Sequence, residues 1–181
     1  KSNFFWVDER CVEPSSFDSN FGSANKHFFS KANISNNNIF RIKGEENPEI
    51  EALNYTELLK TKTEIINNIP SLDLCLLGIG GDGHTASIFP HELKKLSDKT
   101  DCVVGINPES GQKRVSLSIK QINNSKEVIF HVCGSGKKDV VDMIISKRDN
   151  YLDLPASHIL PKSKNLSWYL DFDSAETFMG T

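Results

Sequence analysis

The segment LDLCLLGIGGDGHTASIFP, residues 72–90, joins an apolar run to a loop with four glycines, one aspartate and one histidine. Residues 72–80 barely alternate between apolar and polar side chains, which predicts a strand buried on both faces. The loop matches the dinucleotide fingerprint G-x-G-x-x-G, but that motif needs a long helix and a second strand within about 30 residues. Pro90 interrupts the chain before such a helix can form. We therefore expect no NAD and no other cofactor.

On either side of this segment, apolar runs alternate with helical patterns. Pro48 opens a helix that is predicted to reach about Asn67. The residues predicted on or near its buried face are Ile50, Leu53, Leu58, Ile65 and Ile66. Other helices are predicted at 19–30, at 137–145 with Lys137 in the first turn, and at 174–180. Further strands are predicted at 3–7, 102–106, 114–119, 127–134 and 168–172. This alternation predicts one α/β domain with a mainly parallel, Rossmann-like sheet flanked by helices.

Composition excludes several classes of protein. The 181 residues carry a net charge of −3 and contain no cluster of five basic residues, so we expect no nucleic-acid partner. No apolar run approaches the roughly 20 residues that span a bilayer, so we expect no membrane partner. Cys11, Cys75, Cys102 and Cys133 are far apart, which favours a reducing, cytoplasmic compartment. We expect no metal, because no His, Cys or carboxylate trio has a suitable spacing.

Ligands of open α/β sheets bind at the carboxyl ends of strands, and three polar segments are predicted there. These segments are Asp8–Arg10, the glycine loop and Gly134–Lys137. In the loop, His84 is a candidate acid or base, because the ordinary pKa of histidine is about 6.5. Asp82 is placed to orient it. The alternatives are a histidine bonded to backbone and an aspartate that caps a short helix.

The same segments offer groups that bind anions. Arg10 carries a planar fork suited to phosphate or carboxylate, although a salt bridge to a neighbouring acid is an alternative. Lys137 comes at the predicted start of a helix, as in many anion sites, although it could equally be a solvated surface lysine. Gly80 and Gly81 could offer backbone N–H groups. These residues indicate an enzyme that handles an anionic small molecule.

Several motifs together resemble the 6-phosphogluconolactonase family, which is related to glucosamine-6-phosphate isomerase/deaminase. They are WVDERCVEPSSFDSN (6–20), FRIKGE (40–45), residues 72–90, KRVSLSI (113–119), VCGSGK (132–137), LPAS (154–157) and WYLD (168–171). The family that this chain resembles has a deaminase branch. That branch carries a tyrosine where this chain has Arg10, and a proton-transferring glutamate where this chain has Phe89. The resemblance therefore implies the lactonase branch, which hydrolyses 6-phospho-D-glucono-1,5-lactone without a metal.

The resemblance also implies roles for the candidate residues. His84 would activate water with the support of Asp82. Arg10 and Lys137 would hold the phosphate and the oxyanion, and which residue holds which group is left open. Asp8, Gly80 and Gly81 would contribute to substrate binding. Family members begin with a further helix, strand and phosphate loop, so residues 1–181 are expected to lack these parts of the domain.

Two other functions stay open from the sequence. One is an amino-sugar phosphate isomerase/deaminase, and the other is a non-catalytic module that binds sugar phosphates. We expect a monomer or a weak homo-oligomer.

Overall fold

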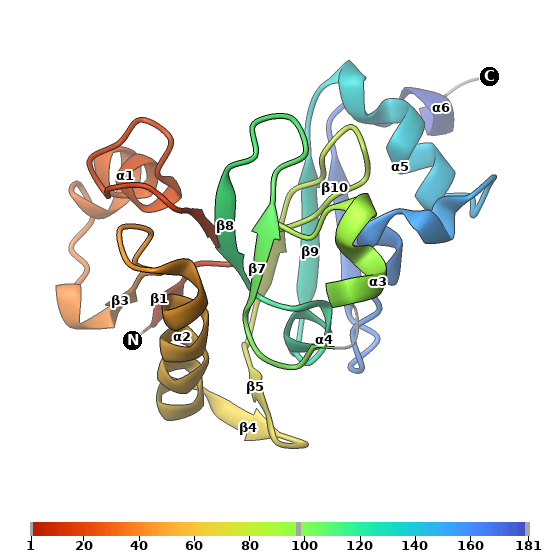
Figure 1. Ribbon diagram of the computed structural model, residues 1–181. Coiled ribbons are helices and arrows are strands. Elements are labelled where there is room, and N and C mark those ends of the chain that lie inside the picture. The colour runs from red at the N-terminus through yellow and green to blue at the C-terminus, as the bar shows by residue number, and fades with distance from the viewer. Residues whose placement is uncertain (1, 97–98, 180–181) are drawn as a thin grey trace.

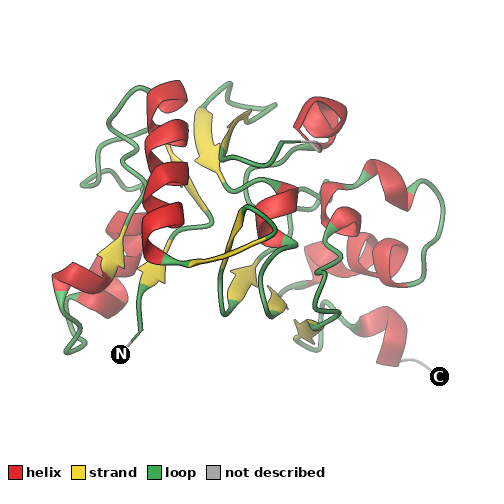
Figure 2. Ribbon diagram, turned by 90° about the horizontal axis from the view of Figure 1, so that it is seen from below, coloured by secondary structure: helices red, strands yellow, loops and turns green. Residues whose placement is uncertain are grey.

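The computed structural model describes residues 2–96 and 99–179, in which helices lie on both sides of the strands (Figures 1 and 2). The helices are α1 (Asn20–Ala24), α2 (Pro48–Lys62), α3 (Leu93–Leu96), α4 (Ile119–Ile122), α5 (Lys138–Ile145) and α6 (Glu176–Met179). The strands are β1 (Phe4–Phe5), β2 (Asp8–Arg10), β3 (Ile39–Phe40), β4 (Glu64–Ile66), β5 (Ile69–Ser71), β6 (Cys75–Leu77), β7 (Val103–Ile106), β8 (Lys113–Ser116), β9 (Val128–Val132) and β10 (Leu166–Leu170). Gly180, the end of the last predicted helix, lies outside the described residues.

The strands form two parallel and two antiparallel groups. Strands β10, β9 and β6 pair in parallel in that order, and so do β1 and β3. Strands β2, β8 and β7 form an antiparallel sheet, and β4 and β5 form an antiparallel pair. The predicted α/β class is confirmed. The antiparallel sheet was not predicted; it arises because the short connection at residues 107–112 folds β7 and β8 into a hairpin.

The predicted strand at residues 3–7 is shorter than expected, and a second strand follows it. Only Phe4–Phe5 belongs to β1, while Asp8–Arg10 is itself strand β2. In the antiparallel pairing, Asp8 lies opposite Ser116 and Arg10 lies opposite Arg114. The polar tripeptide therefore lies within a sheet, where its alternating side chains point to two different faces.

Helix α2 ends earlier than predicted. It stops at Lys62, and Glu64–Ile66 forms β4 where the pattern predicted helix. Asn47 caps its start, because the Asn47 side chain accepts a hydrogen bond from the Ile50 N–H, and Pro48 follows at the first turn. No helix within residues 2–96 and 99–179 combines the length and the apolar character needed to cross a bilayer.

The buried face of α2 also differs from the prediction. Ile50 and Leu53 are more than half exposed, whereas Tyr55 and Thr56 are buried. Thr56 tolerates burial because its hydroxyl accepts a hydrogen bond from the backbone N–H of Cys102 (2.9 Å). The helix thus packs in an orientation that its apolar residues alone do not predict.

Strand β6 is buried on one face only, so the predicted burial on both faces is wrong. Cys75 and Leu77 are buried, but Leu76 between them is 59% exposed. On the same three-stranded sheet, His131 and Tyr169 lie opposite each other and are also exposed. This face of the sheet is therefore open to solvent at these three positions.

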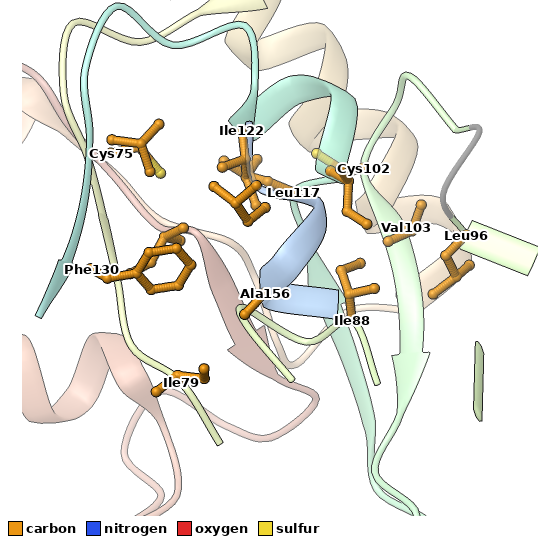
Figure 3. Packing of buried hydrophobic residues seen from close by; sticks show 14 of the residues in the cluster. Cys75, Ile79, Ile88, Leu96, Cys102, Val103, Leu117, Ile122, Phe130 and Ala156 are labelled. Carbon is orange, nitrogen blue, oxygen red and sulfur yellow. The ribbon is translucent and has the colours of Figure 1, made fainter. Parts of the chain in front are cut away.

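The opposite side of the sheet joins one hydrophobic core, part of which is drawn in Figure 3. Phe130 from β9, Leu117 and Ile122 from the β8–α4 region, and Ile88 from the glycine loop are essentially inaccessible to solvent. The loop at residues 78–90 therefore contributes to the core at its far end. This anchoring restricts how far the catalytic candidates in the loop can move.

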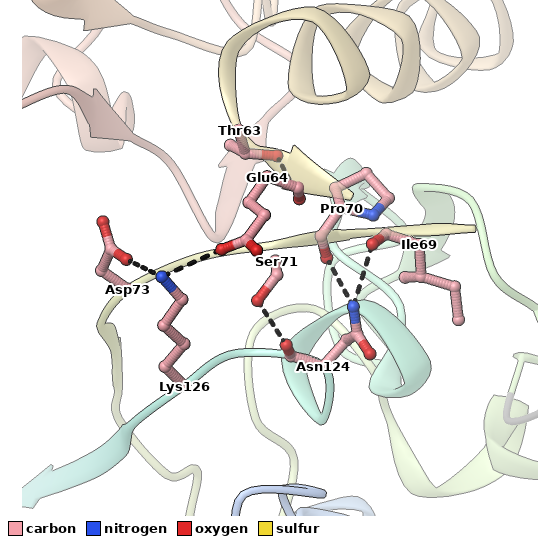
Figure 4. A network of polar contacts seen from close by, with 8 residues as sticks. All are labelled: Thr63, Glu64, Ile69, Pro70, Ser71, Asp73, Asn124 and Lys126. Carbon is pink, nitrogen blue, oxygen red and sulfur yellow. Dashed lines mark hydrogen bonds and ion pairs between the residues drawn. The ribbon is translucent and has the colours of Figure 1, made fainter. Parts of the chain in front are cut away.

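A polar network anchors the β4–β5 pair at a distance from the loop (Figure 4). The side-chain amide of Asn124 donates to backbone carbonyls of the pair, and the backbone carbonyl of Asn124 accepts from the Ser71 hydroxyl (2.7 Å). Lys126 forms ion pairs with Glu64 (3.1 Å) and Asp73 (2.8 Å). The buried side chains of Ser71 and Asn124 are thus satisfied inside the protein.

Candidate active site

The glycine loop folds back on itself directly after β6. The Gly80 N–H donates to the carbonyl of His84 (2.8 Å), and the Gly83 N–H donates to the carbonyl of Gly80 (3.0 Å). Thr85 closes the loop further, because its hydroxyl donates to the Gly78 carbonyl (2.9 Å). The predicted use of the Gly80 N–H as a ligand donor is therefore wrong, since His84 already accepts that hydrogen bond.

His84 and Asp82 form the pair that the sequence predicted. Asp82 Oδ1 lies 2.6 Å from His84 Nδ1 and also accepts a hydrogen bond from the His84 backbone N–H (3.1 Å). Partial burial raises the pKa of the Asp82 carboxyl, but the hydrogen bonds and charge of His84 outweigh burial and leave this pKa below its ordinary value. An ionised Asp82 can only accept a hydrogen bond, so Nδ1 is the donor in this contact and Nε2 takes no part in it.

The packing around this pair requires a glycine at position 80. A Cβ atom there would lie 2.1 Å from His84 Nδ1 and 2.5 Å from Asp82 Oδ1. Both distances are far below van der Waals contact. Gly80 thus lets the imidazole and the carboxylate lie against the backbone of the loop. No helix begins at His84, so the alternative role of Asp82 as a helix cap does not apply.

Phe89 forms the floor beneath His84. Its side chain is 1% exposed, and its ring centroid lies 4.8 Å from that of His84, at an angle of 46°. The guanidinium carbon of Arg114 lies 5.6 Å from the same ring centroid. A buried phenyl ring packs against both side chains and transfers no proton.

A pocket of roughly 240 Å³ opens beside the loop. Its polar lining comes from four parts of the chain, namely Asp8 and Arg10 on β2, Asn20 at the start of α1, His84 in the glycine loop and Arg114 on β8. The structure therefore brings the predicted residues Asp8, Arg10 and His84 to one cavity. Gly80 lines it as well, whereas Gly81 and Lys137 do not.

Arg114 is the pocket residue that the sequence did not reveal. It lies directly opposite Arg10 in the β2–β8 pairing, and burial together with the charge of Arg10 lowers the pKa of its guanidinium. The Nε atoms of both arginines are buried and have no hydrogen-bond partner. The sequence signal for Arg114 was weak, because an arginine that opens a strand is usually on the surface.

Asp8 links the pocket to the loop. Its Oδ2 accepts a hydrogen bond from the Ser87 hydroxyl (2.6 Å), and its Oδ1 accepts from the Asn20 side chain (3.3 Å). Ser87 is fully buried, and its own N–H donates to the Ser116 hydroxyl (3.1 Å). Asp8 therefore both lines the pocket and ties β2 to the His84 loop.

Lys137 lies on the neighbouring loop, just before α5. The Gly134 N–H in this loop donates to the carboxylate of Asp171 (2.9 and 3.1 Å). A Cβ on Gly81 would lie 3.7 Å from the carbonyl oxygen of Gly136, so the two loops are adjacent. Lys137 is half-buried beside the glycine loop but outside the pocket that contains His84.

Within the described parts of the chain, no three His, Cys, Asp or Glu side chains gather as metal ligands. The glycine loop leads into a turn, so the dinucleotide fingerprint lacks its helix, in agreement with the sequence prediction. A histidine–aspartate pair next to two guanidinium groups defines an α/β enzyme that carries out acid–base chemistry on an anionic substrate.

The chain belongs to the family described as glucosamine-6-phosphate isomerases/6-phosphogluconolactonase, whose model matches residues 1–168. It is 38% identical over 160 residues to a 6-phosphogluconolactonase of Treponema pallidum, covering 88% of this chain and 66% of that protein.

Solved structures agree with this assignment. A crystal structure described as the devB protein superposes with a TM-score of 0.92 at 40% identity, covering 97% of this chain and 73% of that one. The 6-phosphogluconolactonase of Trypanosoma brucei superposes with a TM-score of 0.83 at 30% identity and the same coverage. The chain thus spans about two thirds to three quarters of the length of these relatives. The predicted family and fold are confirmed.

Proposed function

We propose that the chain hydrolyses 6-phospho-D-glucono-1,5-lactone to 6-phospho-D-gluconate in the oxidative pentose phosphate pathway. The observation that carries the proposal is the His84–Asp82 pair, packed on the buried ring of Phe89 inside a pocket with two arginines. The lactonase relatives support this choice of substrate.

His84 acts as the general base and then as the general acid. Nε2 takes a proton from water as the water oxygen attacks the lactone carbonyl. The tetrahedral intermediate then collapses, the bond to the ring oxygen breaks, and the imidazolium returns its proton to that oxygen. Asp82 orients the ring and stabilises the imidazolium through the 2.6 Å contact with Nδ1.

The positions of Arg10 and Lys137 support an assignment of each residue to one end of the substrate, which the sequence left open. Arg10 shares the pocket with His84, so we assign it to the reacting end of the substrate together with Asp8. Lys137, on the adjacent loop at the start of α5, is assigned to the phosphate, where a lysine and backbone N–H groups act together. Gly81, next to Gly136 on the loop that carries Lys137, is assigned to substrate binding.

The deaminase alternative fits the site less well. That chemistry needs a proton-transferring group at the position of Phe89, which is a buried phenyl ring beside His84. We place the reaction in the cytoplasm, because all four cysteines are free thiols.

The direct test follows lactone hydrolysis by the full-length protein, coupled to 6-phosphogluconate dehydrogenase. We expect a rate well above spontaneous hydrolysis, and no release of ammonia from glucosamine 6-phosphate. Ammonia release would favour the deaminase. Binding of 6-phosphogluconate without turnover would favour a non-catalytic module.

A further inference from the structure

We propose that Arg114 and Arg10 together form a two-guanidinium subsite for the reacting end of the substrate. The subsite binds the oxyanion that develops on the lactone carbonyl oxygen and then the carboxylate of the product. This inference rests on the proposed lactonase function and adds Arg114 as a residue that contacts the reacting atoms.

The first argument is that Arg114 lacks the partners that other arginine side chains of this protein have. Arg41 forms two hydrogen bonds with the carboxylate of Glu45 (2.8 and 2.5 Å), and Arg148 pairs with Asp142. Arg114, by contrast, forms no hydrogen bond or ion pair with a side chain or carbonyl in residues 2–96 and 99–179. Arg114 is half-buried, and burying its Nε–H group without an acceptor is costly, which favours a site that a ligand completes.

The second argument is charge. Arg10 and Arg114 lie directly opposite each other across β2 and β8, an arrangement of like charges that destabilises a sheet. The nearest acid in the pocket is Asp8, whose carboxylate already accepts hydrogen bonds from Ser87 and Asn20. The Arg10 fork uses one nitrogen, Nη1, to donate to the Asp18 carbonyl (2.6 Å). The pair therefore retains positive charge that an anion would neutralise.

The third argument is position. His84 and Arg114 both contact the ring of Phe89, at 4.8 and 5.6 Å from its centroid. This shared contact places Arg114 at the end of the pocket where His84 transfers protons. Lys137 lies outside this pocket, so the phosphate has a separate cation. Phe89 also leaves the Arg114 charge unneutralised, whereas a glutamate at position 89 would pair with it.

The chemistry matches this geometry. When water attacks the carbonyl carbon, the π electrons move to the carbonyl oxygen, and His84 accepts the proton of the water. When the intermediate collapses, the C=O bond re-forms, the bond to the ring oxygen breaks, and the ring oxygen takes the proton from His84. The product carboxylic acid then releases a proton to solvent, and its two oxygens suit a bidentate guanidinium.

The test compares Arg114→Gln and Arg114→Lys with the matched control Lys113→Gln in the full-length protein. Lys113 precedes Arg114 on β8, but its ammonium pairs with Glu49 at the surface (2.6 Å). We expect Arg114→Gln to lower kcat/KM about 100-fold and Lys113→Gln to leave it unchanged. Arg114→Lys should recover part of the loss, because it retains the charge without the fork.

Two substrates distinguish a role of Arg114 at the carbonyl group from a role at the phosphate group. The loss should be equal for 6-phosphogluconolactone and for unphosphorylated glucono-1,5-lactone, because both have the same carbonyl group. A loss confined to the phosphorylated substrate would make Arg114 a phosphate ligand and overturn the proposal. An unchanged rate in a variant whose melting temperature matches the wild type would also overturn it.

Calorimetry decides the question without turnover. The wild type should bind 6-phosphogluconate more tightly than sorbitol 6-phosphate, which has no carboxylate, and Arg114→Gln should abolish this preference. Equal affinities in the wild type would contradict the proposed subsite. A wild type that prefers the carboxylate but hydrolyses neither lactone would instead contradict only the lactonase function.

Discussion

The glycine loop and the arginine pair line the same pocket but are built in different ways. The contacts that hold His84 come from Gly80, Asp82 and Phe89, all within a few residues of it in the chain. Arg10 and Arg114 meet only because β2 pairs with β8, more than a hundred residues further along the sequence. A catalytic histidine can thus be supported locally, whereas a charged subsite for the substrate depends on long-range strand pairing.

The two regions also differ in how well their polar groups are satisfied. In the loop, the Gly80 and Gly83 N–H groups and the Thr85 hydroxyl all have partners inside the protein. In the arginine pair, both Nε atoms are buried without a partner. The loop is therefore preorganised without a substrate, and the arginine pair is completed by one.

The largest expected effect comes from removing the histidine of the loop. His84→Ala should lower kcat/KM at least about 100-fold, because it removes the general base. The coupled lactone assay measures this loss. His91→Ala is the matched control, since this exposed ring also lies near Phe89, at 6.1 Å between centroids. Activity near the wild-type level in His84→Ala would show that the arginines and the backbone suffice for lactone hydrolysis without a general base at His84.

A smaller effect is expected from the residue that anchors the arginine strand. Glu9, between Asp8 and Arg10, is 2% exposed, and its carboxylate accepts four hydrogen bonds. The donors are the backbone N–H groups of Arg10, Asn20 and Phe21 and the hydroxyl of Ser19, at 2.7–3.0 Å. Glu9→Gln turns an acceptor into a donor that faces these groups.

Glu9→Gln should therefore lower the free energy of unfolding by about 2 kcal/mol, as measured by urea denaturation. The control is Glu49→Gln, whose exposed side chain forms only the surface pair with Lys113. That change should leave the free energy of unfolding close to that of the wild type, because water and salt screen an exposed ion pair. Equal stabilities of the two variants would show that Glu9 does not anchor β2.

The smallest effect is expected from packing within the loop. Gly80→Ala should lower kcat roughly tenfold, because the new methyl group tilts the imidazole away from Asp82 but leaves it in the pocket. Gly81→Ala is the comparison for kcat, since its Cβ meets Gly136 at an ordinary contact distance of 3.7 Å and leaves the His84–Asp82 contact in place, so that any loss from its role in substrate binding should appear in KM. Equal activity of both variants would show that the Asp82–His84 contact contributes little to catalysis.

Much of the pocket could be predicted from the sequence because its parts come in short motifs. The α/β class and the family followed from such motifs, and the structure brings Asp8, Arg10 and His84 together. The roles of these residues and of Lys137 stay predictions that the experiments above test. The backbone donor assigned to Gly80 was wrong, because turn hydrogen bonds depend on how the loop closes.

Other errors have the same physical origin. The exposed Ile50 and the buried Thr56 on α2 reverse the order that hydrophobicity predicts. A tertiary hydrogen bond to Cys102 compensates the burial of Thr56, and no local pattern encodes that partner. Burial depends on what packs against an element, so periodicity alone gives only an average expectation.

The sequence by itself determined the elements whose causes are local. Glycines allow the tight turn after β6, and the two-residue spacing of Asp82 and His84 lets their side chains meet. The tertiary structure alone decided that Arg114 faces Arg10 and shares the Phe89 ring with His84. Strand register joins residues regardless of their separation in the chain, and a charge left unpaired is recognisable only once all its neighbours are in place.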